Sequence, residues 1–124
     1  MKEKIILVVD DDDINIFALS SVLKSKVAKI HTASDGIECL EFLRKNTVDI
    51  VLLDIMMPIM DGYQTLKEIR NDNTLKHLPV IALTALAMVG DKEKCIEAGA
   101  NDYVTKPIDI TILIEKMKIL FGQV

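Results

Sequence analysis

The sequence predicts one α/β domain over residues 1–124, in which five parallel strands alternate with five helices that cover both faces of the sheet. Two observations lead to this fold class. Short apolar runs alternate five times with helical patterns of about ten residues, and no linker or low-complexity segment interrupts the series. Half of the residues are apolar but only 4% are aromatic, so the core should consist of aliphatic side chains in layered α/β packing.

The five expected strands fall into two groups. Three are continuous apolar runs, as is typical of parallel strands covered on both faces: Ile5–Val9, Ile50–Leu53 and Val80–Leu83. Lys29–Ala33 alternates polar and apolar residues, and Asp102–Thr105 is short and polar at its ends, so these two should be the edges. Right-handed crossovers then leave the strand order 2-1-3-4-5.

The helices that follow these strands carry boundary signals. Asp35 with Glu38, and Asp61 with Gln64, are spaced like capping boxes, which satisfy the unpaired N–H groups of a first helical turn. Gly99 should end the fourth helix, since glycine takes a left-handed conformation at little cost.

Composition excludes several classes of function. A net charge of −4 and a pI near 5.1 argue against direct nucleic-acid binding, which needs clustered basic residues. The longest apolar stretch, Leu78–Val89, is shorter than the ~20 residues of a membrane span. Met1–Lys4 leads straight into a strand, so we expect no signal peptide and a cytoplasmic protein. Cys39 and Cys95 lack metal-site spacing and should be buried thiols.

Polar residues collect where the predicted strands end. Strand one ends in Asp10–Asp13 and strand three in Asp54, while Thr84 follows strand four and Lys106 follows strand five. Ligands of open parallel sheets bind beyond the carboxyl ends of the strands where the strand order reverses, here between strands one and three. We therefore expect three acids, a hydroxyl and an amine to converge at this edge.

Such a group of residues suits phosphoryl chemistry. Crowded carboxylates need a compensating cation, and Mg²⁺ fits because it uses few carboxylates together with phosphoryl oxygens. Asp54 could then attack phosphorus while Lys106 and Thr84 offset charge on the transferring group. Asp12 and Asp13 are explained more simply as favourable charges at a helix N-terminus.

At these residues the chain closely resembles the receiver domains of two-component signalling proteins, over almost its whole length. The matching motifs are Ile6–Asp11, Leu53–Pro58 followed by Asp61-Gly62, Ala82–Ala85, and Asp102–Pro107. The resemblance implies a flavodoxin-like (βα)₅ fold. It also implies that this chain is no enzyme in the ordinary sense but a phosphoacceptor that promotes its own phosphorylation and dephosphorylation.

The resemblance also assigns roles by position. It implies that Asp54 is the phosphoacceptor, that Asp11 and Asp54 bind Mg²⁺ directly, that Asp10 binds it mainly through water, and that Met56 adds its backbone carbonyl. Met56 would also flank the path of the hydrolytic water together with Leu86. Because neither side chain can hydrogen-bond a water, slow self-dephosphorylation is expected.

Three further residues receive roles from the same resemblance. Thr84 and Tyr103 match the pair that reorients on phosphorylation, with Tyr103 turning from an exposed to a buried rotamer. Lys106 matches the lysine that contacts the phosphoryl group, and its bond to Pro107 should be cis, as X-Pro bonds permit.

The implied partner is a histidine kinase or a histidine phosphotransfer protein, and we expect a monomer or weak homodimer. Asn15, Ala87–Asp91 and Cys95 resemble the receivers of hybrid kinases and phosphorelays. A stand-alone protein and a segment of a longer kinase both remain open.

A docking surface is expected on the first helix. At 100° per residue, Asn15, Leu19 and Val22 share one face, whereas Phe17 falls on the solvent side. An exposed ring next to Ile14 is the kind of anchor that interfaces use. The alternative is that Phe17 packs against the fifth helix.

Three other classes of protein fit the sequence less well. A haloacid-dehalogenase-like phosphatase would use Asp10 and Asp12 on strand one, but Ile14 stands where that class usually has Thr or Val, and Thr84–Ala87 lacks its later acidic pair. An interaction module with a decayed site is disfavoured because every expected polar group is present. A dinucleotide-binding fold lacks its glycine-rich turn.

Overall fold

The computed structural model describes residues 1–85 and 90–122. In this part of the chain the strands form one parallel sheet of order β2-β1-β3-β4-β5, which confirms the predicted fold class. The elements in chain order are β1 (Ile5–Val9), α1 (Asp13–Leu23), β2 (Lys29–Ala33), α2 (Gly36–Lys45), β3 (Ile50–Asp54), α3 (Gly62–Asn71), β4 (Val80–Thr84), α4 (Asp91–Ala98), β5 (Asp102–Thr105) and α5 (Ile110–Leu120).

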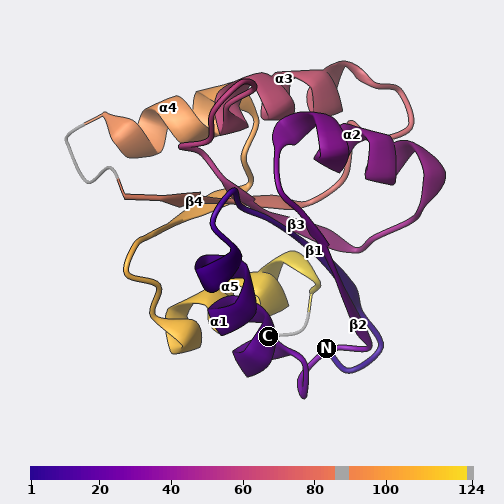
Figure 1. Ribbon diagram of the computed structural model, residues 1–124, viewed down its shortest axis with the longest axis vertical. Coiled ribbons are helices and arrows are strands. Elements are labelled where there is room, and N and C mark those ends of the chain that lie inside the picture. Colours follow the sequence, from indigo (N-terminus) through magenta and orange to yellow (C-terminus); the bar gives the residue numbers. More distant parts are fainter. Residues whose placement is uncertain (86–89, 123–124) are drawn as a thin grey trace.

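Helices cover both faces of the sheet: α1 and α5 lie on one side, and α2, α3 and α4 lie on the other (Figure 1). Alternate residues of each central strand point to opposite faces, so the sheet divides the core in two. Leu7 and Leu53 belong to the half under α2, α3 and α4. Ile6 and Leu52 belong to the half under α1 and α5. All four side chains are fully buried.

The edge strands are the two that the sequence predicted. Only Ala33 is buried in β2 and only Val104 in β5, whereas every residue of β3 and β4 is buried. The central strand β1 has the predicted bounds, whereas β3 and β4 extend one residue beyond their predicted ends, to Asp54 and Thr84. Both functional residues are therefore held by the sheet itself.

The two predicted capping boxes differ in the structure. Asp61 and Gln64 form the complete reciprocal pair at the start of α3. At the start of α2, Asp35 accepts the N–H of Glu38 at 2.8 Å, but the Glu38 carboxylate instead accepts the hydroxyl of Ser34 at 2.6 Å. The prediction of a full box there was wrong, because a hydroxyl one residue earlier competes for the glutamate.

Hydrogen bonds from the guanidinium of Arg70, on α3, hold the end of α4. Gly99 closes α4 with φ of 116°, as predicted. Arg70 lies against it, so that a Cβ at Gly99 would come 2.7 Å from Arg70 Cγ. The guanidinium donates to the carbonyls of Gly99 at 2.8 Å and Leu78 at 2.7 Å, and to Asn101 Oδ1 at 2.9 Å.

Cys39 and Cys95 are fully buried, as expected. Burial and the nearby Asp35 raise the pKa of the Cys39 thiol to about 12, which keeps it protonated and unreactive. Among the helices in residues 1–85 and 90–122, none has the length and apolar character that crossing a membrane requires.

Candidate functional site

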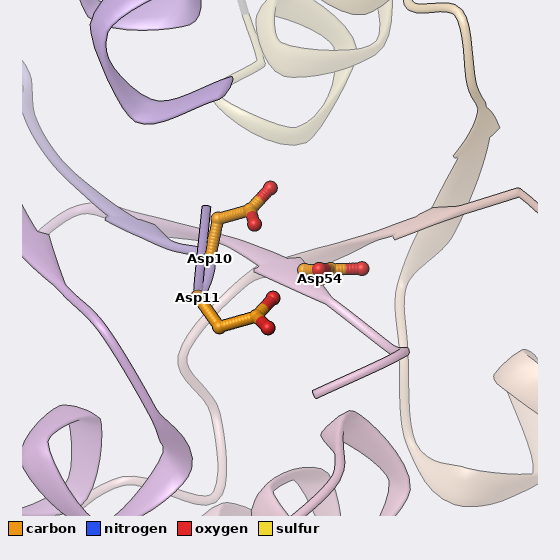
Figure 2. Close-up of side chains that lie close together, drawn as sticks. All are labelled: Asp10, Asp11 and Asp54. Carbon is orange, nitrogen blue, oxygen red and sulfur yellow. The ribbon is translucent and has the colours of Figure 1, made fainter. Parts of the chain in front are cut away.

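Three carboxylates meet at the carboxyl ends of β1 and β3, as Figure 2 shows. Val9 pairs with Leu53 in the sheet, which places Asp10 and Asp54 side by side at the next position along each strand. One oxygen each from Asp10, Asp11 and Asp54 lies within 4.8 Å of the others. Asp10 and Asp54 are only 3% exposed, whereas Asp11 faces solvent. The predicted acidic cluster therefore exists and opens to solvent on one side.

Lys106 supplies a positive charge to this cluster from the end of β5. Its Nζ lies 3.3 Å from Asp10 Oδ2 and 3.3 Å from Asp54 Oδ1. The backbone N–H of Lys106 donates to the carbonyl of Thr84 at 2.7 Å, and the Lys106–Pro107 bond is cis, as the resemblance implied. The sheet thus brings together residues that are far apart in the sequence.

The environment of Asp54 favours its neutral form. Burial, together with the neighbouring charge of Asp10, raises the Asp54 pKa from 3.8 to about 6, although Lys106 and the N–H of Met56 oppose the rise. For Lys106, burial lowers the pKa, but the charges of Asp54 and Asp10 outweigh it and the net pKa is raised. Lys106 therefore stays protonated but does not fully compensate the carboxylates.

Backbone groups orient the two buried acids. The N–H of Met56 donates to Asp54 Oδ1 at 3.1 Å, and the N–H of Asp12 donates to Asp10 Oδ1 at 2.9 Å. The side chain of Asp12 accepts a hydrogen bond from the N–H of Ile14 and caps α1. Asp12 therefore serves the N-terminus of this helix, as expected.

The donor set fits a small, hard divalent ion. Carboxylate oxygens are its preferred ligands, and an exposed carboxylate beside two buried ones leaves space for water. Asp10, Asp11 and Asp54 would hold Mg²⁺, with the backbone carbonyl of Met56 as the further ligand that the resemblance implied.

The two predicted switch residues lie on neighbouring strands, β4 and β5. Thr84 is 1% exposed. Tyr103 is half-buried and packs against the core half under α2, α3 and α4, so its ring is less exposed than the sequence led us to expect. Lys116 from α5 lies 4.8 Å above that ring and donates to the Tyr103 carbonyl at 2.7 Å. Sequence reasoning missed Lys116, because no motif links it to β5.

The exposure of the α1 side chains agrees with the prediction for Phe17 but not with the one that placed Val22 on the same face as the buried Leu19. Ile14 is 77% exposed and Phe17 is 74% exposed, so the alternative in which Phe17 packs against α5 is wrong. Leu19 is buried as expected, but Val22 is 41% exposed. Val22 instead lines a groove of about 350 Å³ beside Asn15 and Leu19, which leads to Asp10 and Lys106.

Of the two residues expected to flank the hydrolytic water, Met56 is exposed beside Asp54. Leu86 lies outside the described residues.

We expect Asp54→Asn to stabilise the metal-free domain at neutral pH. Because the folded-state pKa of about 6 exceeds the unfolded value of 3.8, the folded state binds the Asp54 proton more tightly, and wild type loses stability as pH rises through this window. The variant lacks that loss and should gain about 3 kcal/mol above pH 7. Urea unfolding of both proteins at pH 4 and pH 7.5, with chelator, measures the difference. A gain that is equal at both pH values, or that persists in saturating Mg²⁺, would contradict this explanation.

A five-stranded parallel sheet that carries an acidic cluster and a lysine at the carboxyl ends of its strands defines a class of signalling domain. The family model of the response regulator receiver domain matches residues 6–118, and the chain belongs to that family. It is therefore a receiver domain, the phosphorylation-dependent switch of two-component signalling. The haloacid-dehalogenase-like alternative is thereby set aside.

Individual relatives agree. Response regulator PleD of Caulobacter vibrioides is 40% identical over 115 residues, which cover 93% of this chain but 25% of PleD, so the chain spans about a quarter of that relative. The polar-differentiation response regulator DivK of Brucella anthropi is 32% identical, with 97% of this chain and 98% of DivK covered. The receiver domain of the sensor histidine kinase PA1611 of Pseudomonas aeruginosa, solved with a magnesium ion in its active-site cleft, has a TM-score of 0.88 at 33% identity, covering 97% of this chain and 98% of that one.

Proposed function

We propose that this chain takes a phosphoryl group onto Asp54 from a phosphohistidine protein, in a Mg²⁺-dependent reaction, and works as a switch in a two-component system or phosphorelay. The observation that supports the proposal most directly is the cluster of Asp10, Asp11 and Asp54, with Lys106 within 3.3 Å of two of them. The magnesium ion in the cleft of the PA1611 receiver domain supports the choice of metal.

In the proposed transfer, a carboxylate oxygen of Asp54 attacks phosphorus, the bond from phosphorus to the imidazole nitrogen breaks, and the donor leaves as neutral histidine after taking up a proton. Mg²⁺, when bound, would offset charge on the transferring oxygens. Lys106 is close enough to contribute to the same task, while the N–H of Met56 fixes the Asp54 carboxylate in place. The chain itself acts as acceptor and promotes both gain and loss of the phosphoryl group.

Incubation of the wild-type chain with acetyl phosphate and Mg²⁺ tests the reaction. Intact-mass analysis should show one added phosphoryl group, and chelation of the metal should prevent its addition. Labelling that ignores the chelator would reject the Mg²⁺-dependent mechanism.

We propose that Thr84 and Tyr103 transmit the change. A phosphoryl group adds about −1.5 to −2 charges and strong acceptors near the buried Thr84 hydroxyl, which then moves inward. The half-buried Tyr103 ring follows it and leaves the ammonium of Lys116, which biases the surface of α4, β5 and α5 between two states. Structures with and without a beryllofluoride mimic should differ at both residues. Identical positions in the two structures would remove this mechanism.

We propose that Ile14 and Phe17 contact the phosphodonor. Phe17→Ala should slow transfer from a phosphohistidine protein about tenfold, because an exposed aromatic ring is a frequent interface anchor. Labelling by acetyl phosphate, which needs no protein surface, should stay nearly unchanged. Equal slowing with both donors would assign Phe17 to folding or to site geometry instead.

Further parts of the proposal rest on the family rather than on the site. The partner is a histidine kinase or a histidine phosphotransfer protein, and the chain acts in the cytoplasm as a monomer or weak homodimer without touching nucleic acid or membrane. Because Met56 stands two residues after Asp54 and Leu86 two residues after Thr84, and neither side chain can hydrogen-bond a water, loss of the phosphoryl group should be slow.

A further inference from the structure

A pocket of about 440 Å³ lies at the end of the sheet opposite the acidic cluster. The helices α2 and α3 lie side by side on one face of the sheet (Figure 1), and the pocket opens between the last turn of α2 and the connection from α3 to β4. Its lining residues lead into the amino ends of β3 and β4, whereas Asp54 stands at a carboxyl end. The pocket is therefore separate from the site already described.

The floor of this pocket is apolar. Leu43, Val48 and Leu75 line it, and their exposed fractions are 4%, 7% and 9%. Leu78, from the same connection as Leu75, is half-buried and also lines it. A concave apolar surface with a few polar groups at its rim is the usual form of a small-molecule site.

The rim of the pocket is positively charged. Arg44 and Lys45, both exposed, line it, and none of the described lining residues is acidic. Neither cation forms an ion pair with a carboxylate in the part of the chain that the structure describes. The carboxylate of Asp72, beside the pocket, instead accepts hydrogen bonds from the hydroxyl and the N–H of Thr74, at 2.7 and 2.8 Å.

The position of these two cations in a helix has a simpler explanation, which covers only part of the observation. Basic residues in the last turn of a helix offset its negative end, and Arg44 and Lys45 stand in the last turn of α2. That effect accounts for their residue type. It does not account for the open apolar floor beside them, because a cation that only serves a helix end needs no cavity.

We propose that this pocket binds a small organic phosphate, with its apolar body on the floor and its phosphate group on Arg44 and Lys45. Two positive charges match a dianionic phosphate monoester, and a guanidinium pairs with phosphate oxygens through two parallel hydrogen bonds. Asn46 and Thr47 stand at the same rim and offer further donors. The ligand class is therefore a phosphate monoester of a small ring or alkyl compound.

Arg70 links the wall of this pocket to α4. Its guanidinium donates to the carbonyls of Lys76 at 3.1 Å and Leu78 at 2.7 Å, and Leu78 lines the pocket. The same guanidinium donates to the carbonyl of Gly99, at the end of α4, at 2.8 Å. A ligand that rests on Leu78 thus contacts a segment held by the same side chain as α4. The pocket is an effector site whose occupancy biases α4, a part of the proposal that rests on the proposed function, in which α4 has two states.

A titration followed by amide ¹H–¹⁵N NMR tests the site. The probe is phenyl phosphate, added to the metal-free protein with chelator at constant ionic strength. Shifts should be largest at the amides of residues 44–48 and 74–75, with a Kd of about 1 mM for a ligand of this size. Inorganic phosphate lacks the apolar body and benzyl alcohol lacks the charge, so each should bind at least about tenfold more weakly.

Exposed basic residues provide the variants and their control. Arg44→Gln and Lys45→Gln remove the proposed phosphate contacts, and each should raise the Kd of phenyl phosphate at least about fivefold. Both positions are exposed, so the spectra of the free variants should match wild type outside the pocket. Lys67→Gln, which alters an exposed lysine on α3 that does not line the pocket, should stay within about twofold of wild type.

Two measurements test the link to α4. In wild type the amide of Gly99 should shift with the same Kd as the pocket amides, whereas in Arg70→Lys, which keeps the charge but loses the planar fork, that shift should fall to less than about one third. Wild type that carries Mg²⁺ and beryllofluoride should bind phenyl phosphate with a Kd changed by at least about twofold, because coupling between two sites is reciprocal.

The outcomes separate the site from its effect. Unchanged Kd values in both Gln variants, equal binding of inorganic phosphate, or shifts centred on Asp54 and Lys106 would each reject the site. Shifts that stop short of Gly99, together with one Kd with and without beryllofluoride, would reject only the link to α4. If acetyl phosphate fails to label wild type, the proposed function fails, while the titration alone still decides whether the site exists.

Discussion

Asp54→Asn should abolish phosphoryl uptake from every donor. The amide that replaces the carboxylate is a poor nucleophile, and in the proposed mechanism the remaining acids, Asp10 and Asp11, hold the cation. We expect labelling by acetyl phosphate to fall at least about 100-fold, to the level of an unreacted sample. Intact-mass analysis over a time course measures the loss.

Variants of the other acids serve as controls for this result. Asp13→Asn alters an exposed acid in the first turn of α1, outside the cluster, and should label like wild type. Asp11→Asn should raise the Mg²⁺ concentration needed for half-maximal labelling while leaving Asp54 as the modified residue. A phosphoryl group mapped to Asp10 in any of these proteins would favour a nucleophile on β1 and reject the assignment of Asp54.

Lys106→Met should destabilise the metal-free domain, in contrast to Asp54→Asn. The Lys106 side chain is 24% exposed, and its ammonium contacts the carboxylates of two side chains that are each 4% exposed. Its removal therefore leaves two buried acids close together without a counter-charge. The expected loss is about 2 kcal/mol at pH 7.5, below the range for breaking a fully buried pair because water still reaches the lysine. Saturating Mg²⁺ should recover most of this loss, since the ion would supply the missing positive charge.

A second lysine provides the comparison. Lys116 pairs with Asp102 at 3.0 Å, and the side chains are 26% and 34% exposed, so Lys116→Met should cost less than about 1 kcal/mol and respond little to Mg²⁺. Urea unfolding with chelator and with Mg²⁺ measures both variants. The prediction fails if the two variants lose equal stability, or if Mg²⁺ does not restore the stability of Lys106→Met. Either result would show that Asp10 and Asp54 do not repel one another in the metal-free domain.

The features that the sequence predicted well are those that residue type and strand position determine together. Apolar runs such as Ile50–Leu53 require burial on both faces, which separates central strands from edges and leaves one topology. Once the order is known, every strand end is placed, and the convergence of Asp10, Asp54 and Lys106 follows from parallel pairing alone.

What the sequence did not predict depends on contacts between elements or on the path of the backbone. The Glu38 carboxylate could accept a hydrogen bond from the backbone N–H of Asp35 or from Ser34, and the spacing in the sequence did not show which. Tyr103 is contacted by Lys116, thirteen residues away along the chain, and no motif in the sequence signals this contact. The φ of 69° at Ile59, in the connection between β3 and α3, was not foreseeable, because isoleucine is among the residues least suited to a positive φ.

The Arg70 contacts give α4 two unlike ends. Its last turn is held by hydrogen bonds from Arg70 to the Gly99 carbonyl and to Asn101, whereas Gly90, at its first turn, offers no side-chain cap. Because these hydrogen bonds hold the last turn of α4 to α3, the helix should turn about that end instead of sliding along its own axis. Rearrangement of α4 in this domain is therefore expected to be a rotation with its pivot at Gly99, in which Asp91 and Lys92 travel furthest and Ala98 barely moves.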